Sequence, residues 1–103
     1  MTEQTYLRRT LAQLVDADWA LVRIDNGEHE AQVQTPDAAV TECMAVDEAS
    51  IELLHPSLGW LTLYVVWQTP QGKHSVCPEE CIADYGTQTR EAMARAESIL
   101  LAA

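Results

Sequence analysis

The sequence contains no phenylalanine and no long hydrophobic run. Its longest uninterrupted apolar segments, 63–67 and 99–103, have five residues each, whereas a membrane-spanning helix needs about 20. The paired arginines near the N-terminus precede no apolar stretch of the kind that a signal peptide carries. We therefore expect a soluble, cytoplasmic protein that does not associate with a membrane.

Basic residues are scarce as well. Six Lys and Arg stand against sixteen Asp and Glu, which gives a formal net charge of −10 at pH 7. This balance disfavours direct binding to nucleic-acid phosphates or anionic lipids, because cations supply the attraction to both. A partner attracted by charge would present a basic protein surface. The composition is compatible with a nucleic-acid mimic, such as a phage or mobile-element inhibitor, but composition identifies no family.

Glycine occurs four times, and the motifs of common catalytic folds are missing. The sequence holds no Gly-rich phosphate loop, no Gly-x-Ser-x-Gly elbow and no helix motif with paired histidines. The balance therefore favours a protein that is not an enzyme and that carries no cofactor.

Cysteine is present three times, an odd number in a chain without an export signal, which favours reduced thiols over disulfides. The most enzyme-like cluster consists of His74, Cys77 and Cys81. A zinc site there would need Cys43 or Asp84 as its fourth ligand. The acidic residues at 79 and 80 disfavour a thiolate nucleophile. A small metal- or thiol-dependent protein is our second functional hypothesis, and cysteines that only pack are the simpler interpretation.

Helices are predicted at both ends of the chain. Leucines recur at spacings of three and four from position 7, so an amphipathic helix should run from near Thr2 to before Trp19. A second helix should follow Gly86, capped by Thr87. Residues 35–50 fit either a helix begun by a proline or an alternating strand, with a slight preference for the strand.

The dipeptide Asn26-Gly27 lies between two alternating segments and predicts a two-residue β-hairpin turn. Closing that turn sets Arg23 opposite Glu30, an opposite-charge pair on one face of the hairpin. Further strands are predicted at 50–55, at 60–67 as the central strand, and at 73–77 as a short returning strand.

These segments predict a single α+β domain over residues 1–103, an antiparallel sheet of four to five strands with the N-terminal and C-terminal helices packed on one face. The strand at 60–67 is apolar on both alternating faces, so its far face needs a cover. Either residues 35–50 fold over it or a second copy forms a homodimer. A dimeric sheet protein would bind a small ligand on a face built from Trp60 and Tyr64 or from Leu61 and Trp67, which is our third hypothesis.

Between Arg23 and Lys73 the chain has no Lys or Arg, while acidic residues continue throughout. Our first hypothesis is therefore a non-catalytic interaction module whose acidic surface binds a basic protein. Its alternative is a solvated surface that only keeps the protein soluble. The binding residues we select are Asp25, Glu28, Glu30, Asp47, Glu48 and Glu52.

Overall fold

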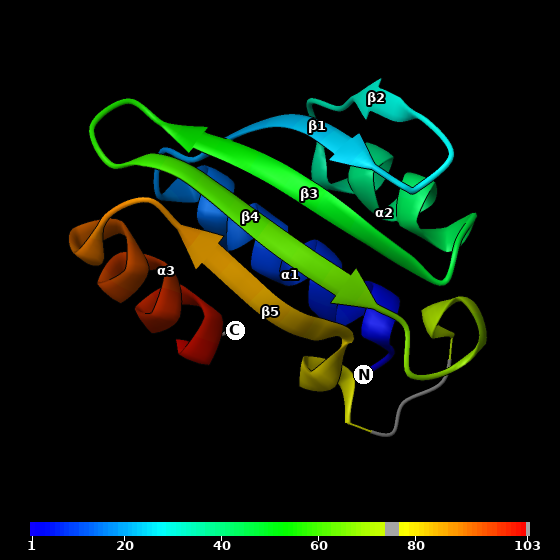
Figure 1. Cartoon of the computed structure of the whole chain (residues 1–103). Coiled ribbons are helices and arrows are strands. Elements are labelled where there is room, and N and C mark those ends of the chain that lie inside the picture. The colour runs from blue at the N-terminus through cyan, green and yellow to red at the C-terminus, as the bar shows by residue number, and fades with distance from the viewer. Residues whose placement is uncertain (74–76, 103) are drawn as a thin grey trace.

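The protein is an α+β domain, described by a computed structural model over residues 1–73 and 77–102. Five antiparallel strands form one sheet in the order β2-β1-β3-β4-β5, as Figure 1 shows. The helices are α1 (Glu3–Asp16), α2 (Pro36–Met44) and α3 (Arg90–Ala102). The strands are β1 (Ala20–Asp25), β2 (Glu30–Gln32), β3 (Glu48–His55), β4 (Gly59–Val66) and β5 (Ile82–Thr87). Short 3-10 turns cover Pro70–Gly72 and Pro78–Cys81. The predicted fold class is confirmed, with five strands.

Helix α1 begins where the sequence predicts. The hydroxyl of Thr2 accepts a hydrogen bond from the Thr5 amide at 3.1 Å and satisfies one of the free donors of the first turn. Leu7, Leu11 and Leu14 form its buried stripe, each fully inaccessible to solvent. The helix runs behind the sheet in Figure 1 and contacts both α2 and α3.

Residues 36–44 are helical, so the slight preference for a strand in this region was wrong. The hydroxyl of Thr35 caps the helix by accepting from the Ala38 amide at 3.2 Å, and Pro36 occupies the first turn. Both features favour a helix start and outweigh the alternation of apolar residues. The helix belongs to the same core as α1, so it does not cover the far face of the sheet.

The β1–β2 connection is a hairpin, but its predicted register was wrong. Arg23 pairs with Gln32 instead of Glu30, and Asp25 pairs with Glu30. The turn is shifted by one residue: the Asn26 amide donates to the His29 carbonyl at 3.2 Å, so these two residues face each other and the turn lies at Gly27 and Glu28. Because the partner strand moves by two positions, each side chain keeps its predicted face.

The side chain of Asn26 explains the shifted turn. Its Oδ1 accepts hydrogen bonds from the amides of Glu28 and His29, both at 3.0 Å, and the residue is only 6% exposed. The carboxylate of Asp25 also accepts from the Gly27 amide at 2.9 Å. These bonds satisfy the amides of the turn and stabilise it at Gly27 and Glu28.

The remaining elements correct two further predictions, and a third falls mostly on residues outside the described ones. β3 is the middle strand of the sheet, and β4 lies between β3 and β5. The strand that returns along β4 is Ile82–Thr87, while most of the predicted strand at 73–77 lies outside the described residues. Helix α3 is capped by Thr89 instead of Thr87, because the Thr89 hydroxyl accepts from the Ala92 amide at 3.0 Å.

The core lies between the sheet and its helices. Alternate strand residues point toward α1 and are almost fully buried: Ile24, Ile51, Leu53, Leu61, Leu63 and Val65. The opposite side of the sheet has no helix over it in the described part of the chain. We call this side, formed by the alternate residues, the open face.

Gly72 gives a test of how closely the turn after β4 packs. Its φ is +67°, and a Cβ placed there would meet the Trp67 ring at 2.5 Å. Gly59 has a φ of +88° but no crowded neighbour, so it is the matched control. We expect Gly59→Ala to lower the free energy of unfolding by about 1 kcal/mol, because of backbone strain. Gly72→Ala should lower it by about 3 kcal/mol, because overpacking against the Trp67 ring adds to the strain. Urea denaturation measures both, and equal losses would contradict the packing at Gly72.

Candidate functional site

The pairing of the strands arranges the open face in rows. One row crosses four adjacent strands through directly opposed residues: Asp25, Ser50, Tyr64 and Asp84. The next row is formed in the same way by Arg23, Glu52, Thr62 and Gly86. Opposed residues of an antiparallel sheet have Cβ atoms about 5 Å apart, so neighbours in a row can interact directly.

The two ends of the open face differ in chemistry. At one end Leu54 lies opposite Trp60, and Leu54 is 37% exposed. At the other end Tyr64 is 44% exposed beside the acidic residues of its row. Trp60 and Tyr64 therefore share this face, whereas Leu61 and Trp67 are buried in the core. The sequence left open which of these two pairs lies on the uncovered face of the sheet, and the structure places Trp60 and Tyr64 there.

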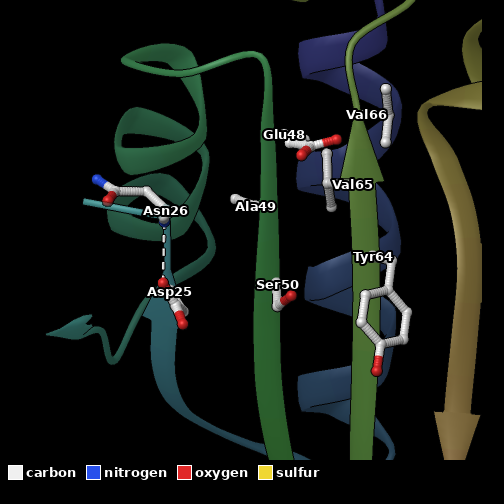
Figure 2. A pocket seen from close by; sticks show the side chains of 9 residues that line it. Asp25, Asn26, Glu48, Ala49, Ser50, Tyr64, Val65 and Val66 are labelled. Atoms are coloured by element: carbon white, nitrogen blue, oxygen red, sulfur yellow. Dashed lines mark hydrogen bonds between the residues drawn. The ribbon is translucent and has the colours of Figure 1, made fainter. Parts of the chain in front are cut away.

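A hollow of about 370 Å³ lies at the acidic end of the open face. Figure 2 shows the strand residues around it, with Asp25 at the end of β1, Glu48 and Ser50 on β3, and Tyr64 on β4. Val66 lies opposite Glu48 and contributes apolar surface beside the carboxylate. The hollow forms where β1 ends and the chain turns away while β3 and β4 continue.

A second hollow, also of about 370 Å³, adjoins the first across the chain segments 27–28 and 47–48. Its lining includes Glu28 and Asp47, the sequence neighbours of Gly27 and Glu48. Met44 and Gln71 complete part of its wall. The hairpin loop and the start of β3 thus separate two depressions, each with acidic side chains at its edge.

The structure brings together four of the six acidic residues that the sequence selects. We call this group the acidic rim: Asp25, Glu28, Asp47 and Glu48, all of them exposed. Glu30 lies beside the rim, directly opposite Asp25. Like charges opposed on neighbouring strands repel each other, so this pair adds to the negative potential of the hairpin.

Glu52 does not belong to this group, because its carboxylate is bound by Arg23. The Arg23 guanidinium donates to Glu52, and this hydrogen bond together with the nearby negative charges raises the pKa of Arg23. Arg8 is paired elsewhere, with Asp37 at 2.6 Å. Within residues 1–73 and 77–102, no carboxylate of the acidic rim forms an ion pair.

The cysteine cluster gains little support from the geometry. Burial raises the pKa of both Cys43 and Cys81 to about 12, so these thiols stay protonated at neutral pH and make poor nucleophiles. Cys77 is exposed, and His74 lies outside the described residues. Among the residues that the structure describes, no group of three or more His, Cys, Asp or Glu could hold a metal ion.

Sequence reasoning missed a buried carboxylate on α1. Glu3 is 1% exposed and accepts hydrogen bonds from the amides of Gln68 and Thr69 at 2.8 and 3.1 Å, and from the Thr69 hydroxyl. It therefore fixes the segment that leaves β4 toward the second hollow. An acidic residue in a first helical turn is common, so the local pattern gave no sign of this role.

Comparison with known proteins places the chain in no family. No family model matches it, and neither the curated proteins nor the solved structures give a significant match. In the described part of the chain, no helix has the length and apolar character to cross a membrane. The acidic rim and the open face are therefore the features that bear on function.

Proposed function

We propose that the protein is a non-catalytic interaction module whose acidic rim binds a basic protein surface. One observation supports this most directly. Carboxylates from two separate chain segments, 25–28 and 47–48, gather around adjoining hollows without a cation paired to them in the described residues. A concave surface with one sign of charge speeds association with an oppositely charged partner and orients it.

A nucleic-acid-binding protein is the partner class that this surface suits best. Such proteins present Lys and Arg to bind phosphates, and the carboxylates of the acidic rim would occupy the same cationic groups. The module would then compete with nucleic acid for its partner. The acidic end of the open face adds apolar and aromatic surface, which a protein partner can bury and which charge alone would not supply.

Two charge-matched variants test the acidic rim. The first replaces its residues by Asp25→Asn, Glu28→Gln, Asp47→Asn and Glu48→Gln, and the second neutralises exposed acids elsewhere by Asp16→Asn, Glu80→Gln, Glu91→Gln and Glu97→Gln. A lysine-rich peptide serves as the basic probe, and its affinity is measured by calorimetry at several salt concentrations. We expect the rim variant to bind about tenfold or more weakly and with a flatter salt dependence.

The control variant loses the same formal charge as the rim variant. It should retain most of the wild-type affinity, because exposed charges beyond a Debye length of about 8 Å from the bound peptide are screened at physiological salt. If both variants lose affinity equally, binding follows total charge and the acidic rim is only a solubilising surface.

A further inference from the structure

We infer that the open face holds an arginine side chain of the partner, with its guanidinium on the Tyr64 ring and its N–H groups toward the surrounding carboxylates. This inference rests on the proposed function and names the residue type that anchors the partner. Tyr64 is unusual for a large aromatic residue, because such residues are normally core residues and this one is 44% exposed on an uncovered sheet face.

The surroundings of the ring are acidic on two sides. Asp84 lies directly opposite Tyr64 on β5, and Ser50 lies opposite it on β3. Beyond Ser50 the row continues through Asp25 to Glu30 on β2, and Glu48 is the next open-face residue along β3. Asp25 and Glu48 line the same hollow as Tyr64, as Figure 2 shows. The ring therefore lies within a field of negative charge.

A guanidinium fits this arrangement better than an ammonium. It is planar, so it can stack on the Tyr64 ring while its edge N–H groups donate to carboxylates. An ammonium is a compact, strongly hydrated charge that loses more solvation on an aromatic surface. The Ser50 hydroxyl between the ring and Asp25 offers a further acceptor. The chemistry of the site thus distinguishes arginine from lysine.

Other occupants match the charge less well. A second copy of this chain would bring its own Asp25, Glu48 and Asp84 to the contact, and each copy carries a net charge of −10. An uncharged apolar ligand would remove these carboxylates from water without replacing their hydration. Only a cationic group both neutralises the charges and uses the aromatic surface.

The test uses two synthetic peptides of equal length and charge, one containing arginine and glycine and the other lysine and glycine. Calorimetry at physiological salt should show the arginine peptide binding the wild-type protein about fivefold more tightly, the size expected for a cation–π contact. Tyr64→Leu should abolish this preference, and Tyr64→Phe should retain it because the ring remains. Trp60→Leu, at the apolar end of the same face, is the positional control and should also retain it.

The outcomes separate this inference from the proposed function. If both peptides bind the wild type equally and only the rim variant weakens binding, the acidic surface stands and the arginine anchor is overturned. If neither peptide binds, the proposed function fails as well. Sedimentation of the free protein completes the test, since a dimer that Tyr64→Leu dissociates would show that a second copy covers the face and would overturn the inference.

Discussion

Glu3→Ala is expected to lower the free energy of unfolding by about 4 kcal/mol, the largest effect of any substitution outside the apolar core. The Glu3 side chain is almost fully buried, and its carboxylate accepts from two backbone amides and one hydroxyl in the partly buried segment 68–69. Its removal takes a charged acceptor away from these three donors, and each hydrogen bond to a charged group contributes about 1.5–3 kcal/mol. Urea denaturation monitored by tryptophan fluorescence measures the loss.

Two further variants separate hydrogen bonding from charge and helix propensity. Glu3→Gln keeps one acceptor oxygen but presents an amide N–H₂ to the other donors, so we expect a loss of about half that of alanine. Glu97→Ala changes an exposed acid on α3 and should fall within about 0.5 kcal/mol of the wild type. A loss at Glu3 as small as that at Glu97 would show that the carboxylate does not fix the 68–69 segment.

The elements predicted correctly are those whose signal is local and repeated. The leucines of α1 return at helical spacing over its whole length, and β3 and β4 alternate or carry β-branched residues throughout. Helix α2 carries a weaker signal because its buried residues Ala39, Val40 and Cys43 also fit other patterns. In this segment the capping residue Thr35 and the following proline indicate the helix more clearly than the pattern of apolar residues does.

Long-range pairing could not be obtained from the same reasoning. The predicted partner of Arg23 was Glu30, next to it across the hairpin, but the actual partner is Glu52 on the other neighbouring strand. The Asn26 side chain accepts from the amides of Glu28 and His29 and so stabilises a turn one residue later than the predicted one, which shifts the register. Contacts such as Glu3 with the 68–69 segment depend on the completed fold, since nothing in the sequence near position 3 indicates which turn lies over it.

The same distinction applies to the acidic residues. Their sequence span predicts a region of one charge. It does not indicate that Glu52 is paired, or that Asp25, Glu28, Asp47 and Glu48 gather around the two hollows. Grouping these four requires the start of β3 to lie beside the hairpin loop, which is a property of the antiparallel β1–β3 pair. The candidate site is therefore a product of topology as much as of composition.

Trp67→Ala is expected to lower the free energy of unfolding by about 4 kcal/mol and to disturb the acidic rim as well as the core. The indole N–H donates to the Cys43 carbonyl at 2.7 Å, and the Trp67 amide donates to the Asp47 carbonyl at 3.1 Å. The residue thus holds the segment 43–47, which connects α2 to the rim. Trp60→Ala on the open face is the matched control, with an expected loss of about 1 kcal/mol since its side chain is only partly buried.

Trp67→Phe isolates the contribution of the indole N–H. The ring stays apolar and nearly as large, so the main losses are the bond to the Cys43 carbonyl and some volume, together about 2 kcal/mol. Hydrogen exchange should then accelerate at the amide of Val46, which donates to the same carbonyl at 3.3 Å. Unchanged exchange at Val46 would show that the rim segment is held independently of Trp67. Faster exchange together with weaker binding of the lysine-rich peptide would mean that the acidic rim binds through a geometry fixed by the core, because the substitution leaves every rim carboxylate in place.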